Sequence, residues 1–265
     1  MAGTRLVKDR RLSLRLSEGL PDDFDYSLIR NAADARWFIF TLRNSDRGKA
    51  AVGLHTHREL IGRKAAYAGI MYAWNRDHGA FYNALQGDSR RLAEMLNDVC
   101  PPVRRSRRLR IWRGVSIREG GPSDAALGLS WTTDRDVACW FAMRWYMCGV
   151  GDQRPFVFEA FIEPTAIVAL WNGRGEREVI VDPTILEFDT AIWVEGKSSY
   201  LEDLDETSQA SPEMITQWRE GYERYMRRKA DRYKAFLRTA SEKWGTTRSA
   251  EASLRDIVKP IADTR

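Results

Sequence analysis

Apolar residues recur every three or four positions through the first hundred residues, which is the spacing of one face of an α-helix. The pattern predicts helices over residues 30–42, 59–74 and 89–99. In the last of these, Leu92, Leu96 and Val99 fall on one face. Pro101 and Pro102 follow, and proline cannot continue a helix. We therefore predict a helical subdomain over residues 1–100.

From residue 109 onward the pattern changes to short runs rich in Val, Ile, Phe and Trp, which are typical of β-strands. The runs are LRIWRGVS (109–116), FVFEAFI (156–162), AIVALW (166–171), EVIVD (178–182) and TAIWVE (190–195). Residues 133–136 have a capping-box pattern, and Val137, Trp140 and Phe141 follow at helical spacing. We expect a sheet with one helix packed on it.

The last part of the chain predicts one long amphipathic helix. Ser211 is a typical N-cap, Pro212 a typical first helical residue, and the helix should end near Gly245. One face is aromatic (Trp218, Tyr222, Tyr225, Phe236) and the other basic (Arg219, Arg224, Arg227, Arg228, Arg232, Lys234, Arg238). We interpret the aromatic face as core packing, and a nucleic-acid surface is the alternative. The predicted fold class is α+β, with a mixed β core over residues 101–265 that includes this helix.

Composition agrees with a folded protein, because 43% of the 265 residues are hydrophobic and 30% are charged. No apolar run approaches the ~20 residues of a membrane span. The first residues lack the apolar block of a signal peptide, so we expect a cytoplasmic protein. Cys100, Cys139 and Cys148 are expected to be buried thiols, and no metal site is expected from the spacing of His and Cys.

The net charge is only +5, but the arginines are concentrated. Seven of them fall between residues 101 and 118, where there is no acidic residue. Such a segment attracts a phosphodiester strand, a diphosphate cofactor or an acidic partner. A solvated linker ahead of the first strand is the alternative for residues 104–108.

Three fragments of the β-rich part have residues suited to chemistry. In the first, the Arg113 guanidinium can bind a phosphate, and Gly114 lets the backbone approach a ligand closely. In the second, Ser130 and Thr132 are two positions apart, so both hydroxyls face one side of a strand. Each of these fragments alone has an ordinary structural explanation.

The third fragment is GRGEREV at residues 173–179. Glu176 and Glu178 are two positions apart, so an extended backbone would direct both carboxylates to the same face. Their repulsion would raise the proton affinity of at least one of them. Such a pair suits a reaction in which one carboxylate stabilises positive charge and the other handles a proton. Trp171 and Arg174 belong to a glycine-containing loop that could meet a second substrate.

Taken in this order, the fragments resemble the R-S-E class of ADP-ribosyltransferases over residues 109–195. The resemblance implies an ADP-ribosyltransferase-like fold with NAD+ as a substrate. It implies that Arg113, Gly114, Ser130 and Thr132 bind NAD+. Glu178 would then be the catalytic glutamate, steadied by Ser130, and Glu176 would orient or deprotonate the acceptor. The related H-Y-E class requires a histidine at position 113, and the sequence has Arg there.

Trp131 departs from the family pattern, in which many relatives have a small residue, and it would either stack on nicotinamide or fill the core. The resemblance leaves the acceptor open between a base of RNA or DNA and a protein arginine, with Arg174 and Trp171 on the acceptor side. It also suggests a bacterial toxin or phage-defence effector, of the kind that is neutralised by an antitoxin protein. The alternatives are a non-enzymatic nucleic-acid-binding protein and an NAD+ glycohydrolase.

Overall fold

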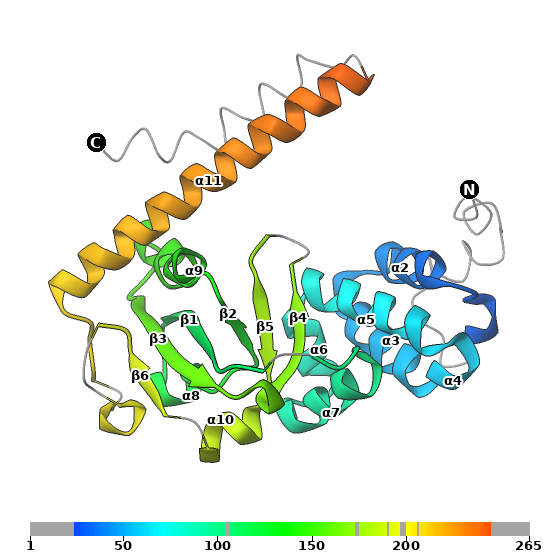
Figure 1. Ribbon diagram of the computed structural model, residues 1–265, viewed down its shortest axis with the longest axis horizontal. Coiled ribbons are helices and arrows are strands. Elements are labelled where there is room, and N and C mark those ends of the chain that lie inside the picture. Colours follow the sequence, from blue (N-terminus) through cyan, green and yellow to red (C-terminus); the bar gives the residue numbers. More distant parts are fainter. Residues whose placement is uncertain are drawn as a thin grey trace. The chain divides into compact units, whose positions relative to one another are not determined.

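The computed structural model (Figure 1) describes residues 24–103, 106–172, 175–189, 191–196, 200–205 and 207–244. It is a mixed α+β structure with one antiparallel six-stranded sheet in the order β4-β5-β2-β1-β3-β6. The strands are β1 (Leu109–Ile117), β2 (Ser130–Thr132), β3 (Arg154–Ile162), β4 (Ile167–Trp171), β5 (Glu178–Val181) and β6 (Ile192–Val194). The predicted α+β class is confirmed, and β2 is the one strand that the sequence pattern did not predict.

The chain divides into two compact units. The first unit contains Met1–Leu109, Gly128–Ser130 and Ile162–Thr190, and the second contains Arg110–Leu127, Trp131–Phe161 and Ala191–Arg265. Strands β4 and β5 therefore belong to the same unit as the N-terminal helices.

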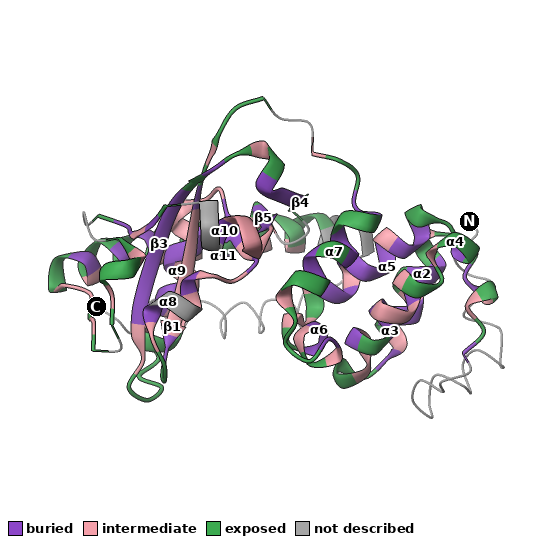
Figure 2. Ribbon diagram, turned by 90° about the horizontal axis from the view of Figure 1, so that it is seen from below, coloured by how far each residue is buried: buried purple, intermediate pink, exposed green. Residues whose placement is uncertain are grey.

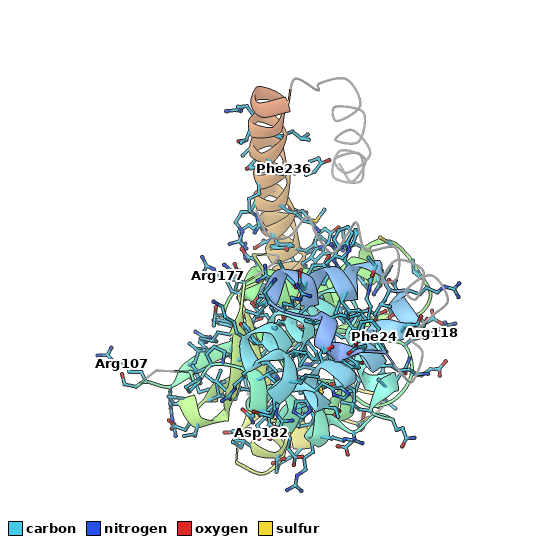
Figure 3. All side chains as sticks on the ribbon, turned by 90° about the vertical axis from the view of Figure 1, so that its right-hand side faces the viewer. Phe24, Arg107, Arg118, Arg177, Asp182 and Phe236 are labelled. Atoms are coloured by element: carbon cyan, nitrogen blue, oxygen red, sulfur yellow. The ribbon has the colours of Figure 1, made fainter. Side chains whose placement is uncertain are left out.

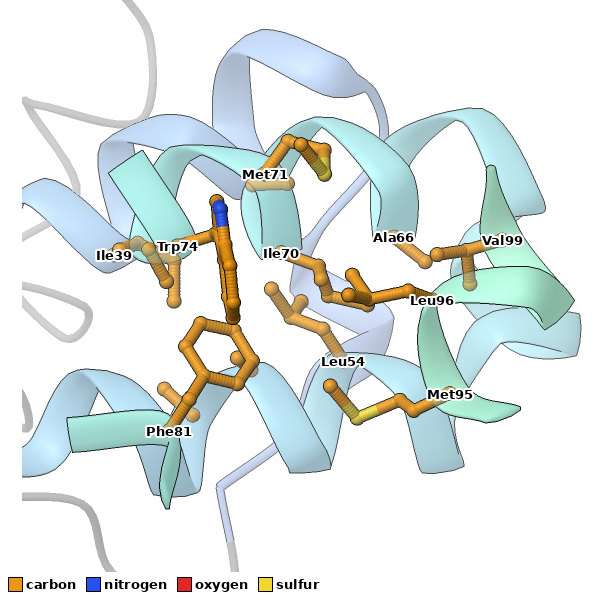
Figure 4. Close-up of a cluster of buried hydrophobic side chains, with 14 of the residues drawn as sticks. Ile39, Leu54, Ala66, Ile70, Met71, Trp74, Phe81, Met95, Leu96 and Val99 are labelled. Carbon is orange, nitrogen blue, oxygen red and sulfur yellow. The ribbon is translucent and has the colours of Figure 1, made fainter. Parts of the chain in front are cut away.

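The first unit is built mainly of short helices. They are η2 (Tyr26–Leu28), α2 (Ala32–Thr41), α3 (Asn44–Thr56), α4 (Arg58–Ile61), α5 (Arg63–Arg76), α6 (His78–Ala84), α7 (Ser89–Val99), η3 (Pro164–Ala166) and α10 (Pro183–Asp189). Their buried faces share one apolar cluster, part of which is shown in Figure 4. Val168 and Ala169 of β4 and Ile180 of β5 belong to the same cluster. The helices and these two strands consequently form one core.

Two glycine effects changed the helix boundaries that we predicted. Gly62 has a φ of 83°, so the helix expected over residues 59–74 is divided into α4 and α5. Helix α3 was missed because Gly48 and Gly53 lower its helix propensity. Both glycines allow close packing, because a Cβ atom on Gly48 would lie 1.9 Å from the Ala80 carbonyl oxygen and one on Gly53 1.7 Å from the Tyr26 hydroxyl.

The second unit contains α8 (Pro122–Ala126), α9 (Arg135–Met147), η4 (Leu201–Asp203) and the long α11 (Pro212–Trp244), together with β1, β3 and β6. Strand β3 is buried over most of its length (Figure 2). Helix α11 packs on α9, where the rings of Tyr225 and Trp140 lie 5.5 Å apart, and the side chains of Trp218 and Tyr225 are buried. Trp218 also donates a hydrogen bond from Nε1 to Glu195 Oε2 at 2.7 Å.

Ion pairs join the same two helices. Arg224 lies 2.9 Å from Asp136, and Arg228 lies 3.0 Å from Asp134. The predicted start of α11 at Pro212 is confirmed, and Ser211 Oγ accepts a hydrogen bond from the Met214 backbone N–H. The prediction that Phe236 is buried was wrong, because its side chain is 60% exposed (Figure 3). Helix α9 has 13 residues and α11 has 33, so α9 is too short to cover the far half of α11.

Candidate active site

Glu178 is the first residue of β5, and its side chain is only 4% exposed. Its Oε1 atom accepts a hydrogen bond from Ser130 Oγ at 2.5 Å, from the first residue of β2. A second hydrogen bond to the same oxygen comes from Trp74 Nε1 at 2.9 Å. Burying a carboxylate is costly unless donors compensate for lost water, and these two donors also fix its orientation. The structure therefore brings Ser130 and Glu178 together, as the sequence predicts.

Trp74 and His78 come from the helical part of the chain, where the sequence analysis placed no functional residue. Trp74 lies in the last turn of α5, and its indole ring packs beside Phe81 with the nitrogen at the end away from that ring (Figure 4). His78, at the start of α6, stacks on Trp74 with ring centroids 4.1 Å apart. Its Nε2 atom lies 3.8 Å from Glu178 Oε1. No local signal could reveal this pairing, because Trp74 and Glu178 are 104 positions apart in sequence.

Glu176 does not follow the geometry that we predicted for it. Strand β5 begins only at Glu178, and Arg177 has a φ of 48°, in the left-handed region. The expectation that an extended backbone directs both carboxylates to one face was therefore wrong. Glu178 is buried whereas Glu176 is partly exposed, so the two carboxylates lie in different environments.

Trp171 is the last residue of β4 and pairs directly with Glu178 in the antiparallel register. It packs against the apolar cluster of the first unit. Its buried Nε1 atom makes no hydrogen bond within the described part of the chain. Arg174, the other residue expected on the acceptor side, lies outside the described residues.

Arg113 and Gly114 lie in the middle of β1, in the second unit. The preceding residue, Trp112, pairs with Thr132 of β2, so the first two sequence fragments occupy neighbouring strands. Arg113 Nε donates a hydrogen bond to the Ala125 carbonyl oxygen at 2.9 Å. The close approach at Gly114 is to α9, because a Cβ atom there would lie 1.7 Å from the Ala138 carbonyl oxygen. Helix packing thus suffices to explain this glycine.

Trp131 and Thr132 are both buried, with 2% and 5% exposure. The burial of Trp131 favours the core-filling alternative over stacking on a ligand. Thr132 Oγ1 accepts a hydrogen bond from the Asp134 backbone N–H at 3.0 Å and so shapes the turn into α9. Ser130 and Thr132 therefore have different hydrogen-bond partners, one at the Glu178 carboxylate and one in the backbone.

Two arginines of the arginine-rich segment form ion pairs. Arg108 forms an ion pair with Glu163, and Arg110 forms another with Glu159 at 2.5 Å. Arg107 is exposed (Figure 3), and residues 104–105 lie outside the described part of the chain. The segment thus supplies structural ion pairs at Arg108 and Arg110.

Burial raises the pKa of the Cys100 and Cys139 thiols to about 12. The prediction of buried thiols is confirmed for these two residues and was wrong for Cys148, which is exposed. Among the described residues, no group of three or more His, Cys, Asp or Glu side chains is arranged to hold a metal ion. Within the same part of the chain, no helix is long and apolar enough to cross a membrane.

In comparisons with known proteins, the chain matches no protein family, no curated protein and no solved structure.

Proposed function

We propose that this protein is an NAD+-dependent mono-ADP-ribosyltransferase with an ADP-ribosyltransferase-like fold. The observation that carries the proposal is the buried Glu178 carboxylate at the start of β5, which accepts a hydrogen bond from Ser130 Oγ at 2.5 Å. This is the pairing that the R-S-E resemblance implies. A serine that orients a buried glutamate through one oxygen suits a carboxylate that stabilises positive charge from a fixed position.

In the proposed reaction, the bond between nicotinamide and ribose C1′ breaks, and positive charge develops on the ribose ring. The Glu178 carboxylate binds the ribose 2′-hydroxyl and stabilises this charge, which exists only near the transition state. A bond then forms between C1′ and a nitrogen or oxygen atom of the acceptor, which loses a proton. Ser130 and Trp74 hold Glu178 through its Oε1 atom, so both are proposed as positioning residues.

The remaining residues have proposed roles on the two substrates. Arg113 binds the diphosphate or the ribose of NAD+, while Gly114, Trp131 and Thr132 support its surroundings through helix packing, core filling and the turn into α9. Glu176 orients or deprotonates the acceptor, and this role suits its greater exposure compared with Glu178. Trp171 contacts the acceptor together with Arg174, and its pairing with Glu178 in the sheet supports this role.

The proposed acceptor is a macromolecule, either a base of RNA or DNA or a protein arginine. A toxin or phage-defence effector in the cytoplasm, neutralised by an antitoxin protein, is the proposed biological setting. If water is the acceptor, the protein is an NAD+ glycohydrolase and Glu176 becomes dispensable. A non-enzymatic nucleic-acid-binding protein would have no use for the Ser130–Glu178 pair.

The test is to incubate the protein with adenylate-labelled NAD+ and cell lysate, and to treat parallel samples with protease or nuclease. We expect macromolecular label and nicotinamide release from the native protein, and a loss of at least about 100-fold in Glu178→Gln. Glu163→Gln is the matched control, since Glu163 is half-exposed and pairs only with Arg108 among the described residues. Nicotinamide release without label would support the glycohydrolase. The absence of both products would overturn the proposal.

A further inference from the structure

A pocket of about 770 Å3 lies in the second unit, between the end of β1, the start of β3 and the first turns of α11. Three arginines line it: Arg118, Arg154 and Arg219. Asp152 is the one carboxylate among the lining residues, so the lining carries a positive charge. A concave site with several guanidinium groups favours a ligand with phosphate groups.

The three arginines have different tasks. Arg154 donates hydrogen bonds to the carbonyl oxygens of Ser208 and Gly120, at 3.1 and 2.8 Å, and so connects the start of β3 to the segments that precede α11 and follow β1. Arg118, which is labelled in Figure 3, and Arg219 are both exposed, and neither forms an ion pair with any described residue. These two guanidinium groups therefore remain available to bind an anion.

The positive charge continues from Arg219 along α11. Three of the basic residues of this helix hold it to the α9 region: Arg224 and Arg228 through ion pairs, and Lys229 over the Trp140 ring. Arg232 lies over the ring of Tyr225 in α11 itself. Arg219, Arg227, Lys234 and Arg238 of the same helix are exposed. Two of them form weak, exposed ion pairs: Arg227 lies 3.9 Å from Glu223, and Lys234 lies 3.7 Å from Asp231.

These four exposed residues span nineteen positions, or about 28 Å of helix at ~1.5 Å per residue. A single small anion would occupy only the pocket, whereas a chain of phosphates would also follow the helix. Tyr146 lines the same pocket and is 39% exposed, so its ring offers a surface on which an unpaired base can stack. Cations that follow a backbone, combined with an exposed ring, are the features by which proteins bind single strands.

We propose that this pocket and the exposed basic residues of α11 bind a single-stranded nucleic acid. Arg118 and Arg219 contact backbone phosphates, Tyr146 stacks on a base, and Arg227, Lys234 and Arg238 contact phosphates further along the strand. The claim that this strand is the acceptor of ADP-ribose rests on the proposed function. Binding of the strand does not, because it needs no NAD+.

The test measures the fluorescence anisotropy of a labelled twelve-nucleotide oligo(U) with the full-length protein, without NAD+, at several salt concentrations. We expect Arg118→Gln/Arg219→Gln to weaken binding at low salt by at least tenfold. The slope of log K against log salt should fall by about 1.4, at ~0.7 per lost contact to a single strand. Arg90→Gln/Arg91→Gln is the matched control, since it removes two exposed arginines of α7. It should leave the affinity within about twofold.

Tyr146→Leu separates strand binding from simple anion binding. It should weaken oligo(U) binding roughly tenfold. When both proteins start from the same bound fraction, the concentration of inorganic pyrophosphate needed to displace the oligonucleotide should be unchanged. Equal binding by the native protein and Arg118→Gln/Arg219→Gln would overturn the proposal, as would preference for an acidic polypeptide or a duplex over oligo(U). If oligo(U) binds here but receives no label from NAD+, the binding site stands and the proposed acceptor is wrong.

Discussion

Glu178 depends on a tryptophan donor from a distant part of the sequence, and a second tryptophan in the protein makes the same type of bond. Trp74 donates to Glu178 at 2.9 Å, and Trp218 donates to Glu195 at 2.7 Å. Both indole rings are buried, so replacement by Phe removes one donor from a carboxylate in each case and keeps most of the packing. The two residues form a matched pair for testing a positioning role.

We expect Trp74→Phe to lower the kcat of nicotinamide release about tenfold and to leave the KM for NAD+ nearly unchanged. The reason is that a hydrogen bond to a charged group contributes about 1.5–3 kcal/mol, and here it orients the carboxylate in the transition state. Steady-state kinetics of both variants measures this. Trp218→Phe should lower Tm comparably without lowering kcat, and an equal fall in kcat for both variants would contradict the positioning role.

The three cysteines differ in their expected reactivity. Because burial raises the pKa of Cys100 and Cys139 to about 12, their thiolates are scarce at neutral pH. Iodoacetamide at pH 8 should label Cys148 in the folded protein and the other two only after unfolding, as read by mass spectrometry of peptides.

The raised pKa values of Cys100 and Cys139 also predict how stability depends on pH. Below pH 9.0, the ordinary pKa of a cysteine thiol, each of these thiols contributes to the free energy of unfolding. This contribution is lost as the pH rises towards 12.

At the scale of elements, α9 is confined by glycines on two neighbours. A Cβ atom on Gly114 of β1 would lie 1.7 Å from the Ala138 carbonyl oxygen, and one on Gly221 of α11 would lie 2.6 Å from Cys139 Sγ. The first contact is with backbone, which cannot give way as a side chain can. We therefore expect α9 to tolerate no added volume on its β1 side.

Gly114→Ala should destabilise the protein by about 3 kcal/mol or more, because overpacking against backbone forces β1 and α9 apart. The free energy of unfolding in urea measures this. Gly79→Ala is the control, since Gly79 is exposed and its Cβ atom would meet only Asp77 Oδ1 at 3.3 Å. A Gly114→Ala protein as stable as this control would show that the two elements can separate without cost.

Most elements could be predicted from the sequence, because their apolar periodicity or their caps are local signals. Helix α7 and the start of α11 were predicted to the residue, and five of the six strands were predicted within a few positions. Helix α3 was missed because its glycines serve contacts with Tyr26 and Ala80, which a local pattern does not contain. Strand β2 has only three residues, too few to establish an alternating pattern.

The candidate site was predicted in part. Ser130 and Glu178 meet as the motif order indicated, but the left-handed backbone at Arg177 separates Glu176 from the strand geometry assumed for it. A positive φ at an arginine is uncommon, so the residue type gave no warning. Trp74 and His78 were missed for a different reason, since only the tertiary fold brings α5 and α6 to β5.

At the scale of the whole molecule, the predicted division at residue 100 can be tested by asking whether residues 101–265 fold without residues 1–100. The apolar cluster of the first unit combines α2 to α7 with Val168, Ala169 and Ile180. A fragment of residues 101–265 would expose these strand residues and would lose Trp74. We expect the fragment to lack the cooperative unfolding transition of the full chain and to release no nicotinamide, as measured by circular dichroism and by the NAD+ assay.

Adding a fragment of residues 1–100 in trans should restore part of both signals, because the missing core residues then return. A control mixture with the 1–100 fragment carrying Trp74→Phe should restore folding more fully than nicotinamide release. A fragment of residues 101–265 that folds and reacts by itself would contradict this account of the core.

The hydrogen bond from Trp74 to Glu178 joins residues that are 104 positions apart in the sequence. Contacts of such sequence separation are costly in loop entropy and form slowly during folding. During synthesis, the indole group is made long before its carboxylate partner leaves the ribosome. On the proposed mechanism, a chain that has not been translated beyond Glu178, about two thirds of its length, has no catalytic carboxylate, and its site forms only when the two distant segments fold together.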